Sequence, residues 1–251
     1  MSVMLYSSFT WQSPRQPGMG EGSGVDRWRR LRGVILACVL ILTSLSPVTA
    51  QRPAACACDP EGPTPPIPPS YVIKGVPLVG QWWNLSCEFA ATAAATGYYG
   101  APVSQQTLLN EIGYDPNPHR GFRGRITGPW GGTQDYGVYA EPIAETLRGY
   151  GFAGSYVFYG GEEELRGAVA DGHPVVAWVT GTWRASVRYV QTYDGERYSL
   201  IPYEHAVTVY AYDEEGVWVM DPTYPAKYEV DWETFRFAWS QFDGMALVVA
   251  R

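Results

Sequence analysis

Residues 81–100, QWWNLSCEFAATAAATGYYG, place one cysteine at the start of an alanine-rich segment. From Cys87 to Tyr99 most residues are small or apolar, and Gly97 and Gly100 close the run. This composition predicts a helix that is buried on most of its faces. A thiol at a helix N-terminus is favoured as thiolate by the helix dipole and the free N–H groups. Because cysteine is also a small hydrophobe, the thiol alone is consistent with either a nucleophile or core packing.

The overall composition indicates a globular domain with an additional segment at one end. The chain has 251 residues and a formal net charge of −7, with 46% hydrophobic and 17% charged residues. The last 200 residues contain no run of lysine or arginine, which argues against nucleic-acid binding, since phosphate contacts need clustered positive charge. The 10 tryptophans and 18 tyrosines are typical of grooves for peptides or sugars, and equally of aromatic cores.

The N-terminal part has the layout of an export signal. Residues 27–50 combine a basic start, an apolar run from Gly33 to Leu45 and the small-residue exit Val48-Thr49-Ala50. The basic residues are Arg27, Arg29, Arg30 and Arg32. This pattern predicts a secretory signal, or an uncleaved membrane anchor through residues 33–50, and both place the following domain outside the cell. Residues 1–26 are predicted to be an unstructured extension.

A proline-rich linker is predicted over residues 51–70, because so many prolines disfavour packed elements. Cys56 and Cys58 lie in this linker without a histidine nearby, so they do not complete a tetrahedral metal site, and we assign them no role. The remaining stretch, residues 71–251, is long enough for one α+β domain.

Within that domain, helices are expected first and a sheet second. Residues 104–112 predict a second helix, and residues 115–137 form a long loop rich in glycine and proline, of the kind that is usually functional. The second half holds short β-branched and aromatic runs with a helix after the first run and another before the last. These runs are SYVFYG, PVVAWVT, ERYSLI, HAVTVYAY, GVWVMDP and MALVVA.

Of the three histidines, His205 is the best candidate for a general base. His119 lies in the long loop and His173 precedes a proline, whereas His205 opens a predicted strand that can hold its side chain rigidly. Residues 213–216 join two runs at hairpin distance, which brings Asp221 back to about the level of His205. A carboxylate there can fix the imidazole tautomer, although Asp-Pro is also a plain turn signal.

These residues suggest a nucleophilic site. Gln81, six residues before Cys87, lies where its side-chain amide can donate to an oxyanion, and a histidine cation would lower the pKa of the thiol. Other catalytic templates lack their parts: G-x-S-x-G, H-E-x-x-H and G-x-x-x-x-G-K-[ST] do not occur. Glu162 to Glu164 are most simply the acidic first turn of a helix. We expect no metal and no organic cofactor.

The chain also resembles a known family. Residues 81–87 with the alanine-rich helix, Glu204-His205-Ala206-Val207 and Val219-Met220-Asp221-Pro222 resemble the papain-like cysteine peptidases of family thirty-nine, relatives of the bacteriocin-leader-processing peptidases. The loop resembles the secreted, stand-alone branch. The resemblance implies a papain-like α+β fold, with the nucleophile helix packed on a C-terminal antiparallel sheet. It also implies that Cys87 is the nucleophile, His205 the base, Asp221 its orienter and Gln81 the oxyanion donor.

One departure concerns the residues after the cysteine. The family commonly has glycine and proline there, whereas this chain has Glu88 and Phe89. Glu88 suits a first helical turn, but its negative charge opposes a thiolate.

The function expected from the sequence is therefore hydrolysis of peptide bonds by an exported, monomeric cysteine peptidase. Trp82, Trp83 and Trp130 are the expected lining of its substrate groove. Two alternatives stay open: a surface-tethered peptide- or wall-binding module that has lost turnover, and an enzyme that transfers the acyl group to an amine.

Overall fold

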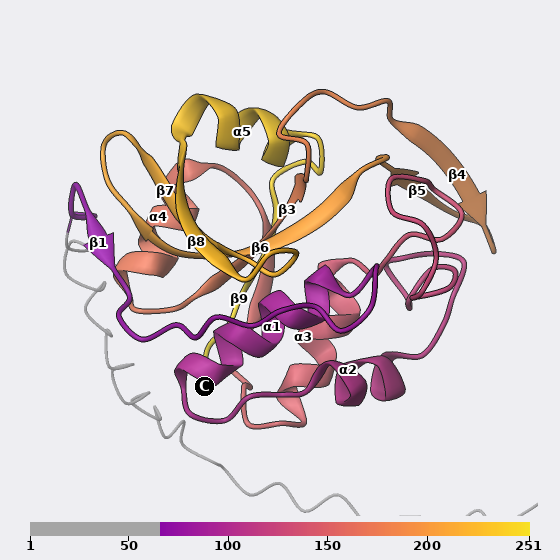
Figure 1. Ribbon diagram of the computed structural model, residues 1–251, viewed down its shortest axis with the longest axis horizontal. Helices are drawn as coiled ribbons and strands as arrows, with labels where there is room; N and C mark the ends of the chain where they lie inside the picture. Colours follow the sequence, from indigo (N-terminus) through magenta and orange to yellow (C-terminus); the bar gives the residue numbers. More distant parts are fainter. Residues whose placement is uncertain (1–65) are drawn as a thin grey trace, which may run out of the picture. The chain divides into compact units, whose positions relative to one another are not determined.

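The structure is a computed structural model that describes residues 66–251 (Figure 1). The predicted extension, export signal and most of the predicted linker lie outside the described residues. At the end of that linker, residues 66–70 contain no helix or strand, and the carbonyls of Pro68 and Pro69 accept hydrogen bonds from Tyr212 and Arg166. Between residues 66 and 251, no helix is both long and apolar enough to cross a membrane.

The order of the elements follows the predicted division into helices and then strands. The first half contains one short strand and three helices: β1 Tyr71–Val72, α1 Cys87–Tyr98, α2 Gln105–Ile112 and α3 Ala140–Arg148. The second half contains β2 Tyr156–Tyr159, α4 Glu162–Ala170, β3 Val175–Thr180, β4 Tyr189–Tyr193, β5 Glu196–Leu200, β6 Glu204–Tyr212, β7 Gly216–Asp221, β8 Ala226–Asp231, α5 Trp232–Ser240 and β9 Met245–Val248.

The main sheet is antiparallel throughout, with strand order β2-β9-β3-β6-β7-β8. The short β1 pairs with the last two residues of β6, beyond the part of β6 that pairs with β3. Strands β4 and β5 form a separate hairpin, which projects beside the long strand β6 in Figure 1. The fold class expected from the sequence, an α+β domain with an antiparallel sheet, is confirmed.

Helices cover both faces of this sheet. Along β3, Val175, Ala177 and Val179 point to one face, and Val176 and Trp178 point to the other, as the two-residue period of a strand requires. The first face packs against α4 and α5, and the second packs against α1 and α3, which also contact α2 (Figure 1). Both faces of β3 are apolar because both are buried.

Helix α1 packs against the sheet through small residues, which allow close approach. Ala90, Ala91, Ala94 and Ala95 are all fully buried. The hydroxyl of Thr208 on β6 donates to the carbonyl of Ala91 over 2.9 Å, so a strand side chain reaches the helix backbone directly. This packing sets the N-terminal end of α1 near the start of β6.

A β-bulge in β6 decides which side chains face one another across the β6–β7 hairpin. The register shifts between Val209 and Ala211, which leaves Tyr210 as the extra residue. Because strand side chains alternate, one extra residue exchanges the two faces for every residue beyond it. With the bulge, His205 and Asp221 share a face as diagonal neighbours, two residues out of register. The sequence predicted them at one level; without the bulge they would lie on opposite faces.

Several elements escaped the sequence prediction. Strands β1, β4 and β8 fall in stretches without a clear alternation, and Gly97 lies within α1 instead of ending it. The long loop over residues 115–137 is irregular, as expected, but isolated bridges join Tyr114 to Phe122 and Arg123 to Gly137.

The core position of Trp178 gives a test of this packing. Its ring is fully buried between α1 and the sheet, and its indole N–H donates to the carbonyl of Val138. We expect Trp178→Ala to lower the free energy of unfolding by about 3–5 kcal/mol, measured by urea denaturation. Trp82 is 61% exposed, so the matched control Trp82→Ala should change it by no more than about 0.5 kcal/mol. Equal effects of the two substitutions would contradict this core.

Candidate active site

A cavity of about 530 Å³ lies where the N-terminal end of α1 meets the ends of β6 and β7. The four residues predicted to be catalytic, Gln81, Cys87, His205 and Asp221, all line it. The remaining lining consists of Asn84, Trp130, Gly181, Trp183, Thr223, Tyr224 and Tyr228. Residues more than one hundred positions apart in the sequence are thus brought to one hollow.

The imidazole and the carboxylate form a tight pair. Nε2 of His205 lies 2.9 Å from Oδ1 of Asp221, with both side chains largely buried. Asp221 also accepts hydrogen bonds from the Thr223 N–H over 2.9 Å and from the Tyr228 hydroxyl over 2.7 Å. Burial opposes the charge of Asp221, but the bonds from His205, Tyr228 and Thr223 prevail and lower its pKa to about 2. Asp221 therefore stays ionised and leaves Nδ1 of His205 as the nitrogen available to a thiol.

The thiol of Cys87 faces a different pair of groups. Its Sγ–H donates to Oε2 of Glu88 over 3.4 Å, and Sγ accepts from the N–H of Ala206. Oxygens of Glu88 and Glu204 and the Cys87 sulfur all lie within 4.8 Å of one another, and all three residues are buried. Within residues 66–251, the side-chain hydrogen bond of Sγ runs to this glutamate, and none joins it to His205.

The prediction of a lowered thiol pKa is therefore wrong for this arrangement. Burial raises the pKa of Cys87 well above that of an ordinary thiol, and the negative charges of Glu204 and Glu88 raise it further. The hydrogen bond from the Ala206 N–H acts in the opposite direction but is outweighed. The helix dipole does not compensate for two carboxylates in a dry interior.

The two glutamates have raised pKa values of their own. Burial raises the pKa of Glu88 to about 7, although the Val138 N–H donates to its Oε1 over 2.8 Å. Burial and the charge of Glu88 raise the pKa of Glu204 well above its usual range. Gly137, with φ +155°, brings the backbone so close that a Cβ there would clash with Oε1 of Glu88. The loop thus closes directly over the carboxylates.

Gln81 lies in the cavity wall, but its amide is already engaged. Its Nε2 donates to the carbonyls of Trp83 and Asn84, over 3.0 and 2.9 Å. Its backbone N–H donates to the carbonyl of Pro222, which ties this turn to the end of β7. To donate to an oxyanion, the amide has to leave at least one of these carbonyls.

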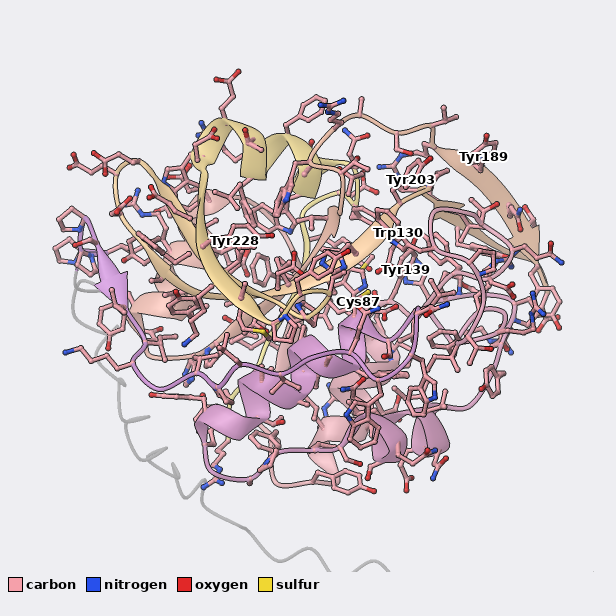
Figure 2. The ribbon with its side chains drawn as sticks, viewed as in Figure 1. Cys87, Trp130, Tyr139, Tyr189, Tyr203 and Tyr228 are labelled. Carbon is pink, nitrogen blue, oxygen red and sulfur yellow. The ribbon has the colours of Figure 1, made fainter. Side chains whose placement is uncertain are left out.

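Only one of the three predicted lining tryptophans belongs to the cavity. Trp130 lines it together with Cys87, and both are labelled in Figure 2. The indole N–H of Trp130 donates to the carbonyl of Glu204 over 2.8 Å. Trp82 and Trp83 lie outside the lining: Trp82 projects into solvent and Trp83 packs at the margin of the core. Local hydrogen bonds explain these positions. The backbone N–H of Trp82 donates to the side chain of Gln105 on α2, and that of Trp83 donates to the side chain of Ser86, which precedes α1.

Two residues of the site, Glu204 and Tyr228, were not predicted from the sequence. Glu204 directly precedes His205, and strand alternation sends its side chain to the opposite face, toward α1, where Cys87 lies. A charged residue before the histidine in an otherwise apolar strand was the available signal. Tyr228 had no such signal, because its contact with Asp221 depends on the pairing of β7 with β8.

Comparison with known proteins agrees with this fold. A model of the Peptidase_C39 like family matches residues 73–247. The antiparallel sheet and the covering helices are those of the papain-like fold, and this chain belongs to the C39-like peptidase family.

The individual relatives share less than a third of their aligned residues with this chain. The uncharacterized protein YvpB of Bacillus subtilis (strain 168) is 29% identical over 185 residues, 66% of this chain and 69% of YvpB. The crystal structure of a protein from Bacillus anthracis, described as a C39-like peptidase, has a TM-score of 0.64 and 26% identity over 72% of this chain and 98% of its own. Xylellain, a cysteine protease from Xylella fastidiosa, has 13% identity and a TM-score of 0.42 over 74% of this chain and 87% of its own.

The surroundings of the thiol predict slow alkylation. We expect iodoacetamide to modify Cys87 with an apparent pKa above that of an ordinary thiol, as followed by mass spectrometry of the peptide that contains it. Glu204→Gln removes one of the opposing charges and should lower this apparent pKa, with about a tenfold change in thiolate fraction for each unit. The matched control is Glu163→Gln, an exposed position on α4. A wild-type rate equal to that of a free thiol would contradict the described surroundings.

The glutamate pair also predicts that stability falls as the pH rises from about 5 to 8. Folded Glu88 and Glu204 keep protons that the unfolded chain releases at its ordinary carboxyl pKa, so deprotonation opposes folding in this window. Asp221, with its lowered pKa, has the opposite effect only below that window. Thermal unfolding should therefore give a higher Tm at pH 5 than at pH 8, with the difference reduced in Glu204→Gln and kept in Glu163→Gln. A Tm that rises toward pH 8 would refute this.

Proposed function

We propose that the chain is an exported cysteine peptidase that hydrolyses peptide bonds, with Cys87 as nucleophile, His205 as base and Asp221 as the group that orients the base. The observation that carries the proposal is the cavity that holds the thiol beside the 2.9 Å pair of His205 and Asp221. Export is proposed from the basic and apolar pattern of residues 27–50.

The chemistry follows from these groups. The Cys87 proton passes to His205 as sulfur attacks the carbonyl carbon, and the resulting imidazolium is stabilised by the ionised Asp221. The carbonyl oxygen becomes an oxyanion that accepts from Gln81, once its amide leaves the carbonyls of Trp83 and Asn84. His205 then returns the proton to the leaving amine. Water hydrolyses the thioester, which releases the acid and restores the thiol.

The lining favours a peptide substrate. Trp130, Trp183, Tyr224 and Tyr228 surround the catalytic groups, and Tyr224 is 82% exposed at the cavity. Such side chains offer broad apolar surfaces with polar tips, which suits an extended peptide. The hollow is lined by neutral groups and Asp221, without a lysine or arginine among them.

A binding module without turnover is the second candidate, and two observations favour it. The thiol is held protonated against Glu88, and the Gln81 amide is occupied by main-chain carbonyls. Both features have to change before the first step. A digest of a peptide library separates the two candidates: cleavage supports the peptidase, whereas retention of intact peptides supports the binding module. Added amine in the same digest reports acyl transfer.

Substitutions in the site give the decisive test. We expect Cys87→Ala to abolish hydrolysis and His205→Ala to lower kcat/KM by at least about 1,000-fold, with unchanged circular dichroism. Asp221→Ala should be milder, because it orients the base and does not itself transfer a proton. Turnover by purified Cys87→Ala protein would refute the assignment, and Glu163→Gln should cleave like the wild type.

A further inference from the structure

The proposed nucleophile belongs to a cluster of metal-ligating atoms that also contains two carboxylates, which hydrolysis does not use. The cluster consists of the Cys87 sulfur and carboxylate oxygens of Glu88 and Glu204, all within 4.8 Å of one another. Cys87 and Glu88 come from the first turn of α1, and Glu204 is the first residue of β6. None of the three side chains is more than 4% exposed.

A second observation points to a ligand. Oε1 of Glu204 is buried without a hydrogen-bond partner among the described residues. Glu88, by contrast, accepts from the Val138 N–H and from the Cys87 thiol. A buried carboxylate oxygen without a donor loses its hydration without compensation, which destabilises the folded chain. A cation held between the two carboxylates and the sulfur would supply the missing interaction.

We propose that Cys87, Glu88 and Glu204 form a binding site for a divalent transition-metal ion of the zinc class. A sulfur with two carboxylates suits Zn²⁺, whereas Mg²⁺ and Ca²⁺ prefer oxygen ligands alone and more of them. Ligand atoms around tetrahedral zinc lie roughly 3.5 Å apart for its usual bond lengths, so the three side chains need to close in only slightly. Of the three ligand residues, Cys87 lines the cavity, so a water molecule from the cavity is the natural fourth ligand of such an ion.

Binding converts the thiol to a metal-bound thiolate and releases its proton, together with any proton held by the glutamate pair, to solvent. The ion coordinates the same sulfur atom that would attack the substrate. It therefore blocks hydrolysis, and this consequence rests on the proposed function, whereas metal binding itself does not. His205 and Asp221 are not ligands in this site, because each already contacts the other.

The test uses the full chain in which Cys38, Cys56 and Cys58 are replaced by serine, so that Cys87 is the single thiol. Titration with Co²⁺ should give thiolate-to-cobalt charge-transfer absorption that saturates at one ion per chain, and Zn²⁺ should displace it. Isothermal titration calorimetry in two buffers should show proton release. If the chain cleaves peptides, Zn²⁺ should abolish cleavage and a chelator should restore it.

Variants distinguish binding at this cluster from binding elsewhere on the chain. Cys87→Ser should remove the charge-transfer band. Glu88→Gln and Glu204→Gln should each weaken Co²⁺ binding by at least about tenfold, because even the loss of a residue that only hydrogen-bonds to a metal ligand weakens metal binding by about that much. Glu163→Gln and His205→Ala should bind as before, although His205→Ala lacks peptidase activity. Absence of the band, indifference to both glutamate substitutions, or its loss in His205→Ala would each overturn the proposal. Because absorption reports binding in an inactive protein, failure of the proposed function leaves this test intact.

Discussion

The packing of α1 on β6 is the contact on which the position of every group in the cavity depends. Four fully buried alanines bring the helix close to the strand, and the hydroxyl of Thr208 ties it to the carbonyl of Ala91. The first residue of the helix, Cys87, thereby reaches the first residues of β6. A bulkier helix would stand farther from the sheet, and sulfur and imidazole would no longer share one hollow.

Strand alternation gives the two sides of that hollow opposite electrostatics. His205 and Glu204 are neighbours in sequence but point to different faces of β6. The histidine meets an ionised carboxylate that accepts three hydrogen bonds, while the glutamate lies beside the thiol in the dry interior. The site therefore combines an imidazole that is well oriented with a thiol whose ionisation is opposed. How strongly the ionisation of the thiol is opposed depends on whether Glu88 and Glu204 carry protons or share a bound metal ion.

Much of this arrangement could be predicted from the sequence. The small residues after Cys87 predicted the buried helix, and the turn at residues 213–216 predicted the hairpin that returns Asp221 to His205. The charge of Glu88 was visible, but its burial was not, because a glutamate in a first helical turn is ordinarily solvated. The state of the thiol could not be predicted either, since it depends on Glu204, more than one hundred residues away, and on a loop that closes over both carboxylates.

The bulge at Tyr210 makes the pairing of His205 with Asp221 sensitive to the length of some segments of the chain and insensitive to that of others. Gain or loss of one residue between His205 and Val209 would turn the imidazole away from Asp221, whatever residue was involved. The exposed turn between β6 and β7 lies outside that segment and can vary in length without this effect. The backbone carbonyl of Tyr210 accepts from the N–H of Ile73, so the segment before α1 holds the irregularity in place. Removal of the chain up to and including Ile73 would thus disturb the pairing of His205 with Asp221, although Ile73 hydrogen-bonds to neither of them.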